Sequence, residues 1–221
     1  MESRAESKNK SPARSNNPVF WDRIALSYSK KPVKDEQAYA QTLDRVRSYL
    51  GIQHNILELG CGTGTTALLL APSVAQLHAT DISGNMIDIA RQKALAEGVR
   101  HVTFAQGTLD DQRAQAGAYD AVLAFNLMHL FEDIPAAITT VHGLLKPGGL
   151  FISKTPCVGE SSFLLRGLIP LLHLFGQAPF VNFIKKDPLR EHYRAAGFEI
   201  IEEGLYPAKS HALFLVGRKA G

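Results

Sequence analysis

Apolar runs that favour strands alternate along this chain with amphipathic segments that favour helices. Five short runs rich in Val, Ile, Leu, Phe and Ala have the composition of buried strands: NILELG, VAQLHATD, VRHVTFAQG, YDAVLAFN and LFISKTP. Parallel strands need long crossover connections, and strands that are apolar on both faces need cover on both sides. The alternation therefore predicts an α/β fold in which helices cover both faces of a mostly parallel sheet.

Local sequence patterns predict further helices and strands before the first strand, between the strands and after the fifth. VFWDRIALSYSKKP and residues 35–50 favour two helices before the first strand. Ser83 is the expected cap of the helix SGNMIDIARQKALAEG, and Gly98 its terminator. Asp187 is the expected cap of the helix DPLREHYRAAGF. FEIIEEGLYP and SHALFLVGRK then predict two closing strands in an antiparallel hairpin.

The length and charge of the chain indicate how many domains it forms and which kinds of partner it can bind. At 221 residues it suits one domain, which we assign to residues 18–221. Residues 1–17 form a polar tail that we expect to be disordered, and its four basic and two acidic residues account for two of the three net positive charges. The remaining body is close to neutral, which argues against a nucleic-acid partner.

The cysteines and the start of the chain bear on its location. The tail has no apolar region typical of a secretory signal. Cys61 and Cys157 are expected to be reduced thiols, so the interpretation is a cytoplasmic protein. No CxxC motif and no His/Cys cluster has the spacing of metal ligands, so no metal is expected.

A glycine-rich loop follows the first predicted strand. ELGCGTGT carries glycines at positions 60, 62 and 64, and Thr65 stands where a dinucleotide fingerprint needs a third spaced glycine. Asp81 ends the second strand, 21 residues after Gly60, where a carboxylate can accept both hydroxyls of a ribose. The combination indicates a ligand that contains a nucleoside, bound where backbone and a helix N-terminus approach it closely.

Further segments extend this pattern along the chain. The run from Asn55 to Arg91 combines ILELGCGTGTTALLL with HATDISGNMIDIAR, and FAQGTLDD, YDAVLAFNLMHLFED and LLKPGGLFISKTP follow in order. Together they resemble the motifs of class I S-adenosylmethionine-dependent methyltransferases, from about Val19 to Lys219. The resemblance implies a Rossmann-like, doubly wound, mostly parallel sheet with an antiparallel C-terminal hairpin. It also implies S-adenosylmethionine as cofactor, but it is not specific for an acceptor.

The resemblance assigns cofactor contacts to residues near the strand ends. It places the glycine loop against the methionine and ribose portions, with Glu58 near the amino group and Asp81 on the ribose hydroxyls. Residues after the second and third strands would pack around the adenine, and Asn126 would lie near the amine and the reactive methyl. The implied set is Glu58, Gly60, Cys61, Gly62, Gly64, Asp81, Ile82, Met86, Thr108, Leu109 and Asn126.

One position departs from the family pattern. The family often has an acidic residue where this chain has Thr108, to accept a hydrogen bond from the adenine amino group. Two replacements are open: the threonine hydroxyl, or the carboxylate of Asp110 reaching across.

Methyl transfer from a sulfonium is an in-line displacement, so a protein contributes mainly alignment and exclusion of water. A base is needed only if the acceptor must lose a proton. His129, just beyond the fourth strand, is the best-placed candidate, and its alternative is a structural histidine. Trp21 and Tyr28 resemble aromatic residues that cap the cofactor in relatives, Tyr28 being a second catalytic candidate, or they are core aromatics. His173 fits packing better than contact with an acceptor.

An apolar segment follows the fifth strand. SSFLLRGLIPLLHLFGQAPFVNFI has the length of a membrane span, but Arg166, His173 and two prolines interrupt it, so we expect no transmembrane helix. We expect residues from about 158 to 184 to form a helical lid over an apolar acceptor pocket. Packing on the core or on a second copy in a homodimer is an alternative, as is transient contact with a membrane.

The favoured hypothesis is a methyltransferase that acts on oxygen or nitrogen of a small, partly apolar molecule. The alternatives are a methyltransferase that acts on transfer RNA or protein, and a regulatory protein that binds S-adenosylmethionine without turnover. A nicotinamide oxidoreductase fits least, because the third fingerprint glycine is missing.

Overall fold

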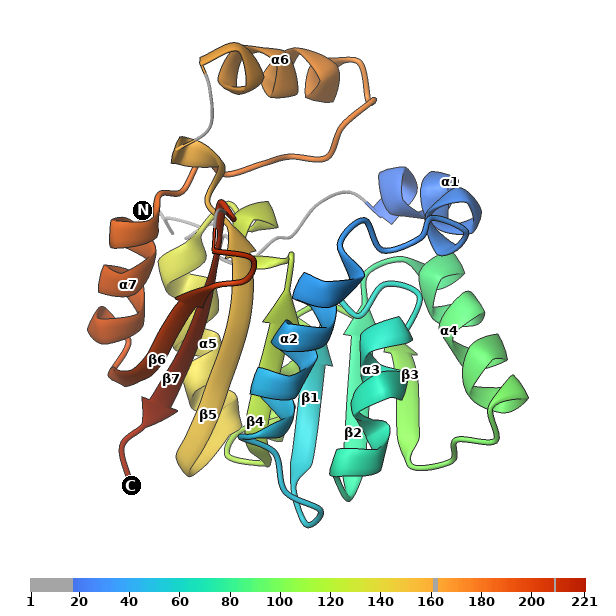
Figure 1. Cartoon of the computed structure of the whole chain (residues 1–221), viewed down its shortest axis with the longest axis vertical. Coiled ribbons are helices and arrows are strands. Elements are labelled where there is room, and N and C mark those ends of the chain that lie inside the picture. Colours follow the sequence, from blue (N-terminus) through green and yellow to red (C-terminus); the bar gives the residue numbers. More distant parts are fainter. Residues whose placement is uncertain (1–17, 161–162, 209) are drawn as a thin grey trace, which may run out of the picture.

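The computed structural model describes residues 18–160, 163–208 and 210–221, with side chains throughout except at residues 163–166. The tail of residues 1–17, predicted to be disordered, lies outside the described part. A seven-stranded sheet has the order β3-β2-β1-β4-β5-β7-β6 (Figure 1). Its strands are β1 (Asn55–Leu59), β2 (Gln76–Asp81), β3 (Val102–Gln106), β4 (Tyr119–Phe125), β5 (Leu145–Pro156), β6 (Phe198–Leu205) and β7 (Ala212–Lys219).

The strand pairing confirms the predicted sheet. The first five strands are parallel, with β1 between β2 and β4, whereas β7 is antiparallel to both β5 and β6. The chain order reverses between β1 and β4. In open α/β sheets a ligand binds at the carboxyl ends of the strands on either side of such a reversal. The topology thus places the glycine loop after β1 at the expected binding position.

Helices cover both faces of the sheet, and side-chain alternation along each strand divides the core into two clusters. One cluster joins strand residues such as Leu57 and Val122 to α5 and α7, and the other joins Ile56 and Leu123 to α2, α3 and α4. The helices are α1 (Pro18–Ser29), α2 (Glu36–Arg47), α3 (Thr65–Leu70), α4 (Gly84–Ala96), α5 (Ile134–Leu144), α6 (Phe163–Leu174) and α7 (Lys186–Ala195), and the 3-10 turns are η1 (Ala71–Ser73), η2 (Asp110–Gln115), η3 (Met128–Leu130) and η4 (Val158–Glu160).

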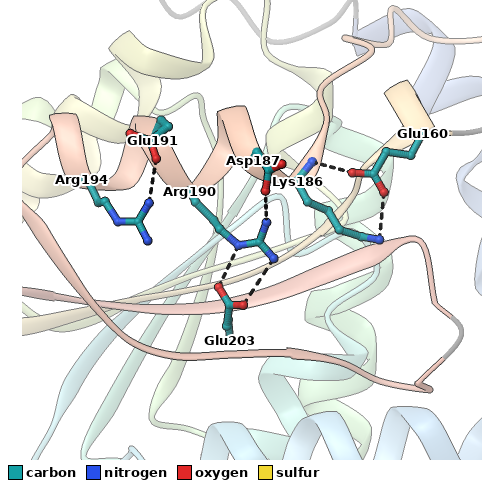
Figure 2. A network of polar contacts seen from close by, with 7 residues as sticks. All are labelled: Glu160, Lys186, Asp187, Arg190, Glu191, Arg194 and Glu203. Carbon is teal, nitrogen blue, oxygen red and sulfur yellow. Dashed lines mark hydrogen bonds and ion pairs between the residues drawn. The ribbon is translucent and has the colours of Figure 1, made fainter.

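Two of the predicted caps can be compared with the structure. The hydroxyl of Ser83 accepts a hydrogen bond from the Met86 backbone N–H at 3.1 Å, as the sequence predicts. The predicted cap of α7 is wrong, because that helix begins at Lys186 and Lys185 occupies its N-cap position without a side-chain bond. Asp187 lies in the first turn and forms an ion pair with Arg190 (Figure 2).

The segment between β5 and α7 leaves and rejoins the body at one narrow place, which we call the neck. The Gly159 backbone N–H donates to the Ile184 carbonyl at 2.9 Å. Glu160 accepts hydrogen bonds from the Lys186 backbone N–H and ammonium, at 3.0 and 2.9 Å (Figure 2). Beyond the neck, α6 stands away from the sheet, above the carboxyl ends of its strands (Figure 1). No helix in the described part of the chain is long and apolar enough to cross a bilayer.

Candidate functional site

A cavity of about 420 Å³ opens where the carboxyl ends of β1, β2 and β4 meet. The loops after these strands and after β3 form its floor and sides, while α1 and the segment that returns from α6 complete the wall. The lining residues are Trp21, Tyr28, Glu58, Leu59, Gly60, Cys61, Gly62, Thr66, Thr80, Asp81, Ile82, Met86, Gly107, Thr108, Leu109, Phe125, Asn126, Leu127, His129, Leu130, Phe131, Pro156, Pro179 and Val181. Ten of the eleven cofactor positions implied by the sequence are among them; the exception is Gly64.

The three loop glycines have different surroundings. Gly60 has φ of +64°, and a Cβ there would lie 2.8 Å from Leu127 Cδ1. Gly62, at φ of +54°, lines the cavity and donates its backbone N–H to Asp81. A Cβ on Gly64 would instead meet Ala90 Cβ at 2.7 Å, inside the packing of α4. Gly64 therefore allows α3 to begin close to α4, and the other two glycines bring backbone to the cavity.

Asp81 holds the glycine loop against the end of β2. Its Oδ2 accepts the Gly62 N–H and its Oδ1 accepts the Ser83 N–H, both at 2.9 Å. Burial raises the pKa of this carboxyl, and the two backbone hydrogen bonds oppose that rise. Because a carboxylate oxygen has two lone pairs, each oxygen can still accept a hydroxyl from a ligand in the cavity.

The carboxyl group of Glu58 lacks a hydrogen-bond partner for one of its two oxygens among the described residues. The Glu58 side chain is 2% exposed, and the oxygen that lacks a partner is the buried Oε2. Burial, with a smaller contribution from Asp81, raises the pKa of Glu58 to about 8. A buried acceptor of this kind is costly unless a donor reaches it, and a cation reaching it would favour the ionised form.

The polar side chains that follow β3 form hydrogen bonds and an ion pair with one another. The hydroxyl and the backbone N–H of Thr108 both donate to Asp111 Oδ2, at 2.8 and 2.7 Å, which lowers the pKa of that aspartate. Asp110 forms an ion pair with Arg113 at 2.9 Å. Thr108 and Leu109 line the cavity, whereas neither aspartate is part of its wall. The Thr108 hydroxyl also accepts the Asp111 N–H at 3.4 Å and keeps one further acceptor lone pair, while the carboxylate of Asp110 is engaged with Arg113.

Two residues after β4 approach the cavity from the other side of the chain reversal. Asn126 has φ of +53°, uncommon outside glycine, and its N–H donates to the Lys154 carbonyl at 2.8 Å. His129 follows in η3, and its Nδ1 is buried without a hydrogen-bond partner among the described residues. Burial lowers the pKa of His129 to about 4, so this imidazole is neutral at pH 7 and can accept a proton.

Helix α1 closes the cavity with Trp21 and Tyr28. Partial burial, followed by the nearby Asp81, raises the pKa of Tyr28, so its phenol keeps its proton at neutral pH. Asp22 attaches the helix to α4: its Oδ1 accepts the Ser83 hydroxyl at 2.6 Å and the Asn85 N–H at 3.1 Å. Asp22 was not predicted from the sequence, because its partners lie more than sixty residues away and no local pattern marks the contact.

The segment after β5 divides into two parts with respect to the cavity. Pro179 and Val181, on the return path, line the cavity, and Asn182 donates its N–H to the His129 carbonyl at 2.7 Å. The described side chains of α6 contribute nothing to the lining. His173 is exposed and lies outside the cavity wall, with its Nδ1 3.1 Å from the Ala178 carbonyl oxygen. The apolar wall near His129 also includes residues that the sequence did not single out, namely Phe125, Leu127, Leu130, Phe131 and Pro156.

Known proteins share both the motifs and the fold. A family model described as a methyltransferase domain matches residues 56–149. The ubiquinone biosynthesis O-methyltransferase of Xanthomonas axonopodis pv. citri is 32% identical over 149 residues, which make up 66% of this chain and 62% of that protein. Over this segment the chain is similar to class I S-adenosylmethionine-dependent methyltransferases, and it spans less than two thirds of the length of the Xanthomonas relative.

Solved structures of class I methyltransferases have the same architecture. YcgJ of Bacillus subtilis aligns with a TM-score of 0.68 and 18% identity over 82% of this chain and 99% of its own. Phosphoethanolamine N-methyltransferase 2 of Haemonchus contortus, solved with S-adenosylmethionine, aligns with a TM-score of 0.69 and 18% identity over 83% of this chain and 53% of its own. At these identities the likeness shows the fold.

The matched methyltransferase domain supports S-adenosylmethionine as the ligand of this cavity, and the cavity fits its groups. The ligand carries an ammonium group, which suits the unpartnered carboxylate oxygen of Glu58. It carries two ribose hydroxyls, which suit the free lone pairs of Asp81. Gly62, where a Cβ would meet only Tyr28 at 3.9 Å, leaves room for a close approach of the ligand to the backbone.

Proposed function

We propose that this chain transfers the methyl group of S-adenosylmethionine to oxygen or nitrogen of a small, partly apolar molecule. The observation that carries the proposal is an apolar compartment around His129, next to the polar residues that suit the cofactor. The neutral His129 lines the same cavity as Leu130, Phe131, Pro179 and Val181, and the Asn182 N–H bond to the His129 carbonyl holds the return segment beside it. Such an apolar lining suits an apolar acceptor body, and the imidazole suits one acidic proton.

The proposed roles of the cofactor residues follow from their hydrogen-bonding capacity. Glu58 binds the ammonium group of the methionine portion, and Asp81 accepts the two ribose hydroxyls. Ile82 and Met86 pack on one side of the adenine, and Thr108 offers its oxygen at the edge. The bound cofactor supplies an electrophilic methyl on a sulfonium, which needs no further activation. Trp21 and Tyr28 exclude water above it.

His129 is proposed to accept the proton of the acceptor. It is uncharged at neutral pH because its pKa is about 4, and its Nδ1 is free of described partners. A base with so low a pKa holds a proton weakly, so this role is useful only when the acceptor loses its proton as the methyl is transferred. Tyr28 keeps its own proton and is proposed to position groups by hydrogen bonding.

The acceptor class and the domain arrangement belong to the same proposal. The Xanthomonas relative is named as an O-methyltransferase of ubiquinone biosynthesis, which favours oxygen as the methylated atom. Residues 18–221 form one methyltransferase domain, and residues of about 158–184 cover the acceptor through the segment around Pro179. We place the protein in the cytoplasm, where thiols such as those of Cys61 and Cys157 remain reduced.

Incubation with isotopically labelled S-adenosylmethionine and cell extract tests the proposal. A labelled product is expected in the small-molecule fraction. The variant Asp81→Ala should give none at low cofactor concentration, because losing the proposed hydroxyl bonds weakens cofactor binding by about 100-fold. Asp44→Ala, at an exposed position on α2, is the matched control. Label confined to RNA or protein would overturn the acceptor class. Tight cofactor binding with no labelled product in any fraction would favour a regulatory protein.

A further inference from the structure

Exposed apolar side chains are concentrated at one end of the molecule. Among the described residues, eleven large hydrophobic side chains are strongly exposed, and eight of them lie in residues 19–33 or 168–175. These two segments comprise α1 with the turn after it, and most of α6 with the residue after it. Both helices lie above the carboxyl ends of the strands (Figure 1). We call the exposed surface of these two segments the apolar rim.

The contribution of α6 to the apolar rim is a continuous stripe. Leu168, Leu171 and Phe175 follow a spacing of three and four residues, which places them on one helical face. They are 48%, 53% and 68% exposed, and Leu174 beside them is 78% exposed. From residue 167 to residue 184 the sequence carries no Lys, Arg, Asp or Glu. Apolar surface gathered in this way indicates a partner that removes it from water.

The two segments of the rim are connected and carry positive charge. Arg23 on α1 donates a hydrogen bond to the Gly176 carbonyl, just after α6, at 2.5 Å. The turn after α1 then exposes Lys30, Lys31 and Lys34. Apolar residues flanked by lysines match the two layers of a membrane interface, in which acyl chains lie beneath anionic headgroups.

We propose that the apolar rim docks reversibly on a bilayer that contains anionic lipids. Two other ways of covering the rim fit less well. A two-fold contact between copies of the chain brings the same patch of each copy together, so the lysines of both copies would gather in one interface and repel one another. Closure of α6 over the cavity would leave Val19 and Leu26 of α1 uncovered, at 65% and 64% exposure.

Docking in this orientation has a consequence for the acceptor. The cavity wall includes Trp21 and Tyr28 from α1 and Pro179 from the return segment, so the cavity lies beside the rim. An apolar acceptor dissolved in the bilayer therefore has a short path to His129. This consequence rests on the proposed function, whereas the docking itself does not.

Cosedimentation of the full chain with vesicles, without a methyl donor, tests the docking. We expect binding to vesicles of phosphatidylcholine with phosphatidylglycerol, and much weaker binding to phosphatidylcholine alone. Replacing Lys30, Lys31 and Lys34 by Gln should weaken binding to the anionic vesicles by roughly 100-fold. Leu171→Asp combined with Phe175→Asp should abolish it. Leu95→Asp is the matched control, because Leu95 is 83% exposed on α4 and lies outside the rim.

These variants, together with a measurement of cofactor binding, distinguish failure of the docking proposal from failure of the proposed function. Absence of binding to anionic vesicles, or binding that the Leu171→Asp, Phe175→Asp variant retains, would overturn the proposal. A dimer in solution that this variant dissociates would identify a second copy as the partner, which also overturns it. Calorimetry with S-adenosylhomocysteine on the same samples reports the cofactor site. Intact cofactor binding without vesicle binding would therefore refute the docking and leave the proposed function in place.

Discussion

Cofactor affinity should depend strongly on pH, because the proposed partner of the cofactor ammonium is a buried carboxyl group. Burial raises the pKa of Glu58 to about 8, and its Oε2 has no described partner. In the proposed complex Glu58 is ionised beside the ammonium. Below pH 8 the free protein holds a proton there that the complex does not hold, so binding releases a proton and weakens as the pH falls.

The size of the effect follows from two ionisations. The ligand is a free amino acid whose ammonium is still mostly protonated at pH 8, where about half of Glu58 is ionised. At pH 6 about 1% of Glu58 is ionised, while nearly all of the ligand amine is protonated. The fraction of pairs in the required state is roughly 50-fold smaller at pH 6 than at pH 8, or about 2.3 kcal/mol of binding free energy. Above about pH 9 affinity should fall again as the ligand amine loses its proton.

Isothermal titration calorimetry with S-adenosylhomocysteine measures both quantities. Titrations at pH 6 in buffers of different ionisation enthalpy should reveal about one proton released per ligand bound. The variant Glu58→Gln keeps the shape of the side chain but has no proton to release. Its affinity should be nearly constant between about pH 6 and pH 7. A wild-type affinity that is also constant over this range, without proton release, would refute the role assigned to Glu58.

Three further predictions concern the cap, the proposed base and the glycine loop. Asp22→Ala removes two hydrogen bonds that attach α1, and about 2 kcal/mol lost from that attachment should weaken S-adenosylhomocysteine binding about 30-fold by calorimetry, with Asp44→Ala unchanged. His129→Gln should lower kcat by about 100-fold and leave cofactor affinity within about twofold; an equal loss of both would indicate a structural histidine. Gly60→Ala adds a Cβ 2.8 Å from Leu127 at a positive φ, which should cost roughly 1–3 kcal/mol of folding stability in urea unfolding. An unchanged unfolding midpoint would contradict that strain.

The parts of the fold that the sequence predicted depend on local patterns. Strand composition, helical periodicity and the Ser83 cap are properties of neighbouring residues, and they predicted a mostly parallel sheet with helices on both faces. The strand order, with its reversal between β1 and β4, was not predicted. The residue pattern and the resemblance both predicted the closing antiparallel hairpin, but not that β7 lies between β5 and β6. The residues implied to bind the cofactor gather around one cavity, because they follow the ends of adjacent parallel strands.

The features that the sequence did not predict depend on contacts between residues that are far apart along the chain. A helix needs partners for its first N–H groups, and the sequence suggested Asp187 for α7. Glu160, which lies across the neck, accepts the Lys186 N–H instead, so α7 begins two residues earlier than a cap at Asp187 requires. The Asp22 attachment was missed for the same reason. For Gly64 a local motif was misleading: the glycine motif predicts contact with the ligand, whereas Gly64 packs against α4 and does not line the cavity.

The neck makes the acceptor side of this protein easy to alter. Gly159 approaches the backbone of the returning chain so closely that a Cβ there would lie 2.2 Å from the Phe183 carbonyl oxygen, and Glu160 binds Lys186 beside it. The two ends of the intervening segment are therefore fixed whatever lies between them. Doubling the length of a closed loop costs only about 0.6 kcal/mol of entropy. Insertions or deletions beyond the neck can thus change which molecules reach His129 while the sheet and the cofactor loops keep their stability.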